Sequence, residues 1–403
     1  MNILFLSLGK YDSIYEHGIY TDLLREFITH ENDVFILSPV ENRGVGEIRV
    51  IHEKQSMILK VPTGRIQKTN IIEKGVNTVL IETRYKKAIK KYFQDIKFDL
   101  ILYPTPPITL AGAVKYVKKR DGARSYLLLK DIFPQNAVDI GLMTKTGIKG
   151  FLYKYFRKKE KKLYAISDYI GCMSKANVDY VIKHNPEINP TKVGICPNCV
   201  EVRDLRLGGA ERVEMRKKND IPIDKKVFIY GGNLGKPQGI PFLIKCLEWC
   251  RNKKDAYFLI IGDGTEYGKL EAFFTKEKPE NMKLMKRLPK EDYDRMVAAC
   301  DVGMIFLDYR FTIPNFPSRL LSYLQAGLPV LACTDINTDI GNLITNGQFG
   351  WWCASNDLKA FGKVIEEACR SDLRKIGNIG YKNLIDFYNI SIAYREIMEK
   401  MEK

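Results

Sequence analysis

Short apolar runs alternate with helical segments along this chain, and this alternation is the feature that most constrains its fold. Runs such as residues 2–8 and 99–103 indicate buried parallel strands, and the amphipathic segments between them indicate helices. The alternation stops at residues 201–224 and starts again at residue 226. A chain of 403 residues is too long for one ordinary core. The pattern therefore predicts two doubly wound α/β domains.

Polar residues follow several predicted strands of the first half. His17 and Gly18 come after the first strand, and Thr105 and Asp131 each follow a later one. Ligands of parallel sheets bind beyond the carboxyl ends of the strands, so we expect these residues on the ligand side of the first domain. An incidental loop histidine would explain His17 equally well, and capping of the next element would explain Asp131.

A glycine-rich segment follows the predicted strand at residues 226–230. The segment, Gly231-Gly-Asn-Leu-Gly-Lys-Pro-Gln-Gly239, permits close backbone approach to a phosphate or sugar, and Lys236 adds a cation. It lacks the GK[ST] ending of a Walker A loop and the GxGxxG spacing. A second glycine turn, Gly262-Asp-Gly264, ends the next predicted strand, and Arg287 ends a short strand after that.

Residues 314–329 indicate a loop and then a helix that begins near Ser318 and ends at Gly327. Pro317 cannot extend the helix backwards, and the Ser318 hydroxyl is a suitable N-cap. A helix N-terminus attracts a diphosphate, and Arg319 places a cation in the first turn, where the helix dipole alone favours an acid. An ordinary α/β crossover would produce the same pattern.

The formal net charge of +16 comes largely from two basic segments, residues 84–97 and 145–162. Both predict helices with aromatic and aliphatic residues on one side and Lys or Arg on the other. This pattern is typical of a helix on an anionic membrane surface, where each cation contributes about 1 kcal/mol. A solvated face would also explain it, and nucleic acid is a third interpretation, without a supporting motif. The predicted membrane-surface residues are Lys154, Arg157, Lys158, Lys159, Lys161 and Lys162.

The nine cysteines are odd in number, scattered and mostly set in apolar runs, which favours reduced thiols in the cytoplasm. Cys196 and Cys199 have CxxC spacing, but no second pair or nearby histidine supports zinc, so a metal or redox role is the less favoured interpretation. No window reaches the roughly 18 apolar residues of a membrane span. The N-terminus looks like a buried strand and not like a signal peptide.

Taken together, these motifs resemble the GT-B glycosyltransferases of family 4, and the resemblance covers nearly the whole chain. They are similar to the bacterial surface-polysaccharide branch, which transfers amino sugars. The motifs that carry the resemblance are Tyr230 to Gly239, Gly262 to Gly264, Leu288 to Asp292, Asp301 to Gly303 and Pro317 to Val330, with Pro104 to Pro107, Asp131 to Pro134 and Pro197-Asn198 in the first half.

The resemblance implies an α/β GT-B fold with two Rossmann-like, doubly wound domains facing across a cleft. It also implies a C-terminal helix that crosses back to the first domain. We accordingly divide the chain into an acceptor-binding domain at residues 1–200, a nucleotide-sugar-binding domain at 201–385 and a returning helix at 386–403.

The resemblance further implies a retaining glycosyltransferase that needs no metal and no cofactor besides its nucleotide-sugar donor. We expect it to move a sugar from a UDP-sugar to a polyprenyl-diphosphate-linked acceptor in capsule or O-antigen biosynthesis. The sugar would be an N-acetylated amino sugar, with N-acetyl-L-fucosamine as one candidate. The enzyme would be cytoplasmic and peripheral on the inner face of the bacterial cell membrane. The sequence leaves the sugar, the linkage and the oligomeric state open.

The predicted catalytic residues are Asp131, Lys236 and Arg319, of which the two cations would stabilise the charge on the leaving phosphate. The predicted donor-binding residues are Gly231, Gly232, Asn233, Gly235, Gln238, Gly262, Asp263, Gly264, Arg287, Pro317, Ser318 and Ser322. The predicted acceptor-side residues are His17, Gly18, Thr105 and Asp131, and no metal ligand is predicted.

Two departures from the family pattern keep other functions open. Many members carry an E-x7-E pattern whose second Glu binds the ribose, and this chain has Pro314 and Ser322 at those positions. The usual Arg and Lys of the glycine loop are Asn233 and Gln238, a loss for which Lys236 and Arg319 would compensate. The alternatives are a catalytically silent GT-B subunit of a transferase complex, a GT-B nucleotide-sugar epimerase and a nucleic-acid-binding protein.

Overall fold

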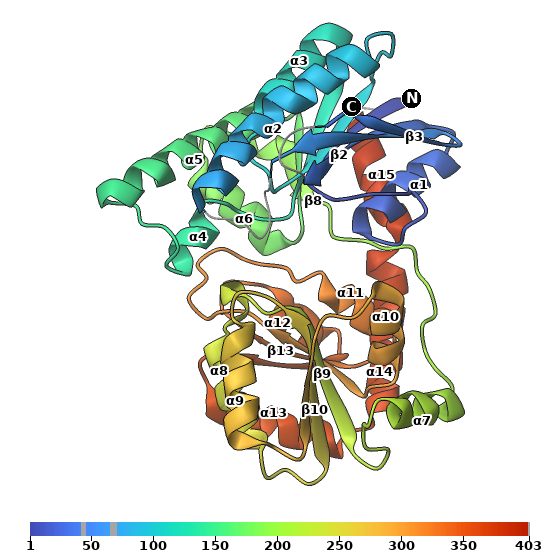
Figure 1. Ribbon diagram of the computed structural model, residues 1–403, viewed down its shortest axis with the longest axis vertical. Helices are drawn as coiled ribbons and strands as arrows, with labels where there is room; N and C mark the ends of the chain where they lie inside the picture. The colour runs from blue at the N-terminus through green and yellow to red at the C-terminus, as the bar shows by residue number, and fades with distance from the viewer. Residues whose placement is uncertain (42–45, 65–70, 402–403) are drawn as a thin grey trace. The chain divides into compact units, whose positions relative to one another are not determined.

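The computed structural model describes residues 1–41, 46–64 and 71–401, and the chain forms two compact units. The N-terminal unit contains Met1–Glu201 together with Ile390–Lys403, and the C-terminal unit contains Val202–Asn389. Each unit is an α/β domain built on a mainly parallel sheet (Figure 1). The predicted fold class, two Rossmann-like, doubly wound α/β domains, is confirmed.

The N-terminal unit has an eight-stranded sheet in the order β3-β4-β2-β1-β5-β6-β7-β8. Strand β3 is antiparallel to β4, and the other described neighbours are parallel. The order reverses between β1 and β5, so the loops after these strands flank a topological switch point. The strands are β1 (Asn2–Leu6), β2 (Asp33–Glu41), β3 (Arg49–Glu53), β4 (Ser56–Thr63), β5 (Leu100–Pro104), β6 (Arg124–Leu129), β7 (Tyr169–Cys172) and β8 (Val193–Ile195).

The C-terminal helix belongs to the N-terminal unit, as predicted. In α15, the Tyr394 ring lies 4.9 Å from the Phe27 ring and 4.1 Å from the His30 ring, measured between centroids. The backbone N–H of Ile390 donates to the Val200 carbonyl at 2.9 Å. The helices of this unit are α1 (Ile19–Thr29), α2 (Ile71–Tyr92), α3 (Ala111–Asp121), α4 (Gln135–Asp139), α5 (Gly147–Ile166), α6 (Lys175–His184) and α15 (Ile390–Met401).

The C-terminal unit has a six-stranded sheet in the order β11-β10-β9-β12-β13-β14, and all described pairs are parallel. Its switch point lies between β9 and β12. The strands are β9 (Lys226–Asn233), β10 (Ala256–Asp263), β11 (Met282–Met285), β12 (Val302–Phe306), β13 (Val330–Thr334) and β14 (Gly350–Ala354). The helices are α7 (Gly209–Lys218), α8 (Ile240–Cys250), α9 (Tyr267–Glu277), α10 (Lys290–Ala298), α11 (Arg319–Gln325), α12 (Ile340–Asn346), α13 (Leu358–Arg370) and α14 (Leu373–Tyr388).

Residues 41–75 are polar and lack a clear period, which predicts an irregular loop, and this prediction is wrong for the described part of the segment. Strands β3 and β4 form a hairpin there, and helix α2 begins at Ile71. The apolar pattern of β4 is interrupted by Lys60, and a lysine in the middle of a strand normally indicates an exposed position. Its ammonium is instead buried, and it donates to the Tyr11 carbonyl and to the Asp12 carboxylate, each at 2.7 Å. The positions 42–45 and 65–70 lie outside the described residues.

Every helix in the described part of the chain is too short or too polar to cross a lipid bilayer.

Candidate functional site

Many of the predicted donor-binding residues lie at the switch point of the C-terminal unit. Parallel α/β sheets bind ligands at this position, beyond the carboxyl ends of the strands on either side. Here these strands are β9 and β12, followed by the glycine segment and by residues 307–318. The strand predicted to end at Tyr230 in fact continues to Asn233, since Gly231 and Gly232 pair with β10.

Most of the glycines in this region are explained by packing. A Cβ atom on Gly231 would lie 2.0 Å from the Tyr293 hydroxyl oxygen, and one on Gly262 would lie 2.0 Å from the Gly232 carbonyl oxygen. Gly232 differs, because its φ of +120° requires glycine and the nearest atom to its missing Cβ is Nη2 of Arg319, at 3.4 Å. Of these three glycines, Gly232 is therefore the one that faces the predicted phosphate site.

Arg319 is the residue whose surroundings most clearly call for a ligand. Its guanidinium carbon lies 4.4 Å from the centroid of the Tyr230 ring, in a cation–π contact. Its Nη1 atom is buried and has no hydrogen-bond partner among the described residues. Burial opposes the charge of Arg319, but the neighbouring Tyr230 and Tyr323 raise its pKa overall, so it stays a cation. A buried, unpaired donor is costly, and an anion beside Gly232 would satisfy it.

Hydrogen bonds of the Gln238 and Tyr230 side chains with residues of the glycine segment hold this loop in shape. The Gln238 side-chain oxygen accepts from the Asn233 side-chain amide at 3.1 Å and from the Gly235 N–H at 3.2 Å. The Tyr230 hydroxyl donates to the Asn233 carbonyl at 2.9 Å. Lys236 begins the 3₁₀ turn of this loop and is exposed to solvent. The loop is thus held in shape by its own residues, with Lys236 free to turn outward.

The predicted helix start at Ser318 differs from expectation. The helix α11 has only seven residues, and the Ser318 side chain makes no capping hydrogen bond, because the Ser318 backbone is itself helical. Pro317 precedes it, and Ser322 lies partly exposed within α11. The cation at Arg319, and not the helix N-terminus, therefore characterises this end of the site.

The remaining predicted donor residues lie on neighbouring strands. Asp263 is exposed at the end of β10, and its carboxylate accepts from the Gly264 N–H at 2.9 Å. A Cβ atom on Gly264 would lie 2.5 Å from the Leu234 backbone, so packing explains this glycine too. Arg287 is exposed after β11, the edge strand, which is two strands away from β9.

Thr105 and Asp131 meet at the carboxyl edge of the N-terminal sheet. The Thr105 hydroxyl donates to the Asp131 carbonyl at 2.9 Å and accepts from the backbone N–H groups of Lys130 and Asp131 at 3.0 and 3.1 Å. The Asn136 side-chain amide lies 2.7 and 2.8 Å from the two Asp131 carboxylate oxygens. Burial raises the pKa of Asp131 to about 6, although Asn136 lowers it. Asp131 therefore loses its charge near pH 6, at a higher pH than an ordinary aspartate.

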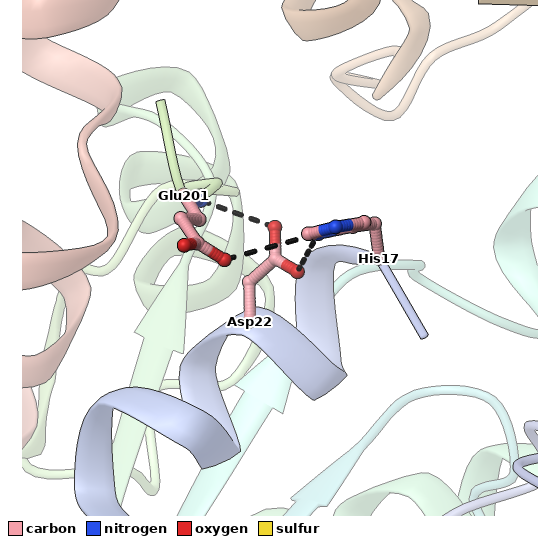
Figure 2. A group of neighbouring side chains, drawn as sticks. All are labelled: His17, Asp22 and Glu201. Atoms are coloured by element: carbon pink, nitrogen blue, oxygen red, sulfur yellow. Dashed lines mark hydrogen bonds and ion pairs between the residues drawn. The ribbon is translucent and has the colours of Figure 1, made fainter. Parts of the chain in front are cut away.

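His17 lies in a different group, together with Asp22 and Glu201 (Figure 2). Their potential metal-ligating atoms are within 4.8 Å of one another. The Arg25 guanidinium, however, occupies the centre of this group: Nη2 lies 2.6 Å from Asp22, 2.7 Å from Glu201 and 3.2 Å from His17. This is an ion-pair network in which Arg25 is the resident cation, and a metal ion would have to displace it.

The same network anchors the loop that carries Gly18. The Gly18 N–H donates to the Asp22 carboxylate at 3.0 Å, and the Glu201 N–H donates to the other oxygen at 3.0 Å. Sequence reasoning named His17 and Gly18 but missed Asp22 and Arg25, as well as Asn136 beside Asp131. Asp22 and Arg25 could have been found from the sequence, because oppositely charged residues at i and i+3 lie next to each other on a helix.

The CxxC cysteines are buried free thiols, like most of the nine cysteines. Burial raises the pKa of Cys199 to about 12, so its thiolate, the form that binds metals, is disfavoured.

Parts of this chain are similar to known glycosyltransferases. Residues 211–383 match the family described as "Glycosyl transferases group 1". The chain is 24% identical over 322 residues to a probable glycosyltransferase, WbjE of Pseudomonas aeruginosa, covering 78% of this chain and 76% of the relative. It is 24% identical over 251 residues to a putative colanic acid biosynthesis glycosyl transferase, WcaI of Escherichia coli K12, covering 61% of this chain and 60% of that protein.

Solved structures show the same fold over the whole chain. Sucrose-phosphate synthase from Thermosynechococcus elongatus has a TM-score of 0.77 at 12% identity and covers 100% of this chain and 99% of its own. Anabaena HepE in complex with UDP has a TM-score of 0.69 at 13% identity and covers 100% of both chains. This chain therefore has the GT-B fold and carries, at residues 211–383, a group 1 glycosyltransferase domain.

Proposed function

We propose that this protein is a retaining, metal-independent glycosyltransferase that moves a sugar, an N-acetylated amino sugar in our proposal, from a UDP-sugar to a polyprenyl-diphosphate-linked acceptor. The C-terminal unit would bind the nucleotide sugar and the N-terminal unit the acceptor. The product would enter capsule or O-antigen biosynthesis. The names of the relatives support this assignment, since WcaI is described as a colanic acid biosynthesis enzyme. The HepE structure, which contains UDP, supports the choice of nucleotide.

The unpaired, buried Nη1 of Arg319 is the observation that carries the donor half of the proposal. Cleavage of a sugar–diphosphate bond leaves negative charge on the departing phosphate. A guanidinium held in place by the Tyr230 ring, beside the glycine backbone at Gly232, stabilises that charge without reorganising. Lys236, exposed on the neighbouring loop, adds a mobile cation. In this proposal the two side chains take the charge-neutralising role that a divalent metal has in other enzymes.

Asp131 carries the acceptor half of the proposal. The acceptor oxygen would bond to the anomeric carbon on the face from which UDP departs, so that the configuration is retained. Asp131 would take the proton of that hydroxyl, which requires the carboxylate form. A pKa of about 6 suits that task, since the group is ionised at neutral pH and yet more basic than an ordinary aspartate. Thr105 would fix the backbone of Asp131, and Asn136 would orient its carboxylate.

A thermal-unfolding screen with UDP, GDP, ADP, dTDP and their common sugars tests the donor assignment. We expect the melting temperature to rise with UDP or a UDP-sugar and not with the other nucleotides. A ligand at 100 times its dissociation constant adds about 2.7 kcal/mol of stability, which is readily measured. A chain that no nucleotide stabilises would instead be the silent subunit, and Ser322 in place of the family glutamate would be the reason.

We also propose that helix α5 holds the protein peripherally on the inner face of the cell membrane. Figure 1 shows α5 projecting from the body of the N-terminal unit. Among the described side chains of α5, the large exposed apolar ones are Phe151, Leu152 and Tyr155, with exposed fractions of 76%, 43% and 40%. Lys154 and Lys158 are exposed beside them. Apolar side chains next to cations suit an anionic bilayer surface.

The contribution of α5 cations is smaller than the sequence suggests, because some are used within the protein. Arg157 is ion-paired with Glu160 at 2.5 Å, and Lys161 with Glu187 at 2.9 Å. Lys159 lies 5.6 Å from the centroid of the Tyr155 ring, and Lys162 is exposed. We therefore place the contact surface on the first half of α5.

Sedimentation with phosphatidylglycerol vesicles tests this surface. We expect the wild-type protein to bind, and to dissociate as salt is raised, because screening weakens the cationic contribution. Replacing Phe151 and Leu152 with serine should weaken binding by about tenfold or more, since each buried side chain of this size contributes roughly 1.5–3 kcal/mol. Phe387→Ser, at a site of 59% exposure in the C-terminal unit, is the matched control. Absence of binding at every salt concentration would refute the membrane proposal.

A further inference from the structure

A cavity of about 770 Å³ lies at the amino end of the C-terminal sheet. Lys226 begins β9, Asp301 immediately precedes β12, and Leu328 lies just before β13; all three line it. The strands are parallel, so this cavity is at the opposite edge of the sheet from Gly232 and the glycine loop. Strand β9, with eight residues, separates the two edges by about 25 Å. The cavity is therefore a second site, separate from the donor site.

The lining is cationic. Arg206, Arg212, Lys226 and Arg374 face two acidic residues, Asp301 and Asp372, which leaves a formal excess of two positive charges.

The acidic lining residues are already committed to neighbouring groups. Asp301 accepts from the guanidinium groups of Arg212 and Arg216, each at 2.6 Å, and from the Val227 N–H at 2.7 Å. Asp372 caps helix α14 by accepting from the Lys375 N–H at 3.1 Å. These carboxylates are thus held by the protein.

The cations differ in how much of their bonding capacity is used. Arg206 is paired with Asp204 at 2.6 Å, and Lys226 donates to the carbonyls of Cys369 and Ser371. Asp204 and Arg216 lie next to the lining and carry opposite charges, so including both leaves the positive excess at two. The Arg374 side chain is exposed and makes no hydrogen bond or ion pair with the part of the chain that the structure describes. It lies in the first turn of α14, where the helix dipole disfavours a cation.

We propose that this cavity binds a small phosphorylated molecule, held at its phosphate by Arg374, Arg212 and Lys226. Guanidinium groups match the geometry and charge of phosphate oxygens, and a dianionic phosphate balances an excess of two positive charges. A volume of 770 Å³ lies within the range of small-molecule sites. The apolar side chains of Leu207, Leu328 and Leu373 complete the lining and would contact the uncharged part of the molecule. This inference does not depend on the proposed transferase activity.

Isothermal titration calorimetry with inorganic phosphate, pyrophosphate and glucose 6-phosphate tests the site. We expect saturable binding of at least one of them, at one site per chain, in the Arg319→Met variant as well as in the wild type. That variant removes the buried cation of the donor site but keeps Lys236, so binding belongs to the cavity when Arg319→Met retains it and the cavity variants lose it. Arg374→Ala should weaken binding by about tenfold, the equivalent of one charge-assisted contact.

A second substitution adds bulk at the cavity lining without removing charge. Gly209 lines it, and a Cβ atom added there meets no other atom within 4 Å, so Gly209→Phe places a ring in open space. We expect this variant to fold and to lose binding. Lys276→Ala removes an exposed cation on α9 and is the charge-matched control, with unchanged binding. No saturable heat from any of the three probes at millimolar concentrations would overturn the proposal. So would binding that is lost in Arg319→Met and retained in both cavity variants, because it would belong to the donor site.

Discussion

Replacement of Arg319 by methionine should lower kcat/KM for the UDP-sugar by a factor of about 10² to 10³, the usual cost of removing one preorganised donor to a developing negative charge. The reason lies in its surroundings. The guanidinium is fixed against the Tyr230 ring, and its Nη1 is buried without a partner in the described chain. UDP binding should weaken in parallel. A hundredfold loss of affinity reduces the stabilisation by UDP from about 2.7 to about 0.4 kcal/mol at the same concentration.

The stability of the ligand-free variant separates a binding role from a structural one. Methionine keeps the length of the stem and removes a buried, unsatisfied donor, whose cost of roughly 1–3 kcal/mol offsets the lost cation–π contact. We therefore expect Arg319→Met to unfold near the wild-type temperature without UDP. Arg319→Lys should retain part of the activity, since it keeps the charge and loses the planar fork. Arg295→Met, at an exposed position of α10, should change neither quantity. An unchanged response to UDP in Arg319→Met would mean that the phosphate binds elsewhere.

Replacement of Asp131 by asparagine should lower kcat by about 10² to 10⁴, the usual contribution of a positioned general base. The pH profile gives a sharper test. Burial raises the pKa of Asp131 to about 6, so the active carboxylate form should disappear below that pH, and the rate should fall tenfold for each further pH unit.

Unfolding does not explain such a loss of activity. The folded pKa of Asp131 lies above the unfolded value of about 3.8. Between these pH values the folded protein binds the proton more tightly, so this group makes the fold more stable as the pH falls from 6 towards 4. The rate and the stability should therefore change in opposite directions over this window.

Asn136→Ala provides the second arm of the Asp131 test. The Asn136 amide stabilises the Asp131 carboxylate and lowers its pKa, so its removal should move the midpoint of the pH profile above 6. Gln135→Ala is the matched control, because that side chain donates to Asp139 at 2.7 Å. A midpoint that is unaffected by Asn136→Ala would exclude Asp131 as the titrating group.

The fold could be predicted from the sequence because it depends on local patterns. Buried parallel strands appear as apolar runs, and each helix between them carries its own amphipathic period. The break at residues 201–224 was equally visible. The β3–β4 hairpin was missed because Lys60 is buried through contacts with Tyr11 and Asp12, almost 50 residues earlier in the chain. A single-sequence pattern does not contain such a partner.

The sequence by itself determined the two α/β units, the approximate ends of their strands and therefore the segments after those strands in which Arg319 and Asp131 lie. Only the tertiary structure decided what these residues contact. Arg319 meets Tyr230 and Gly232, nearly 90 residues away, and is left with an unpaired donor, whereas His17 is drawn into the network around Arg25. The physical reason is that strand order is set by which strands pack together, and it brings distant loops to one edge of a sheet. The spacing of apolar residues along the chain predicts the helices and strands. The packing of these helices and strands decides which polar side chains have no hydrogen-bond partner.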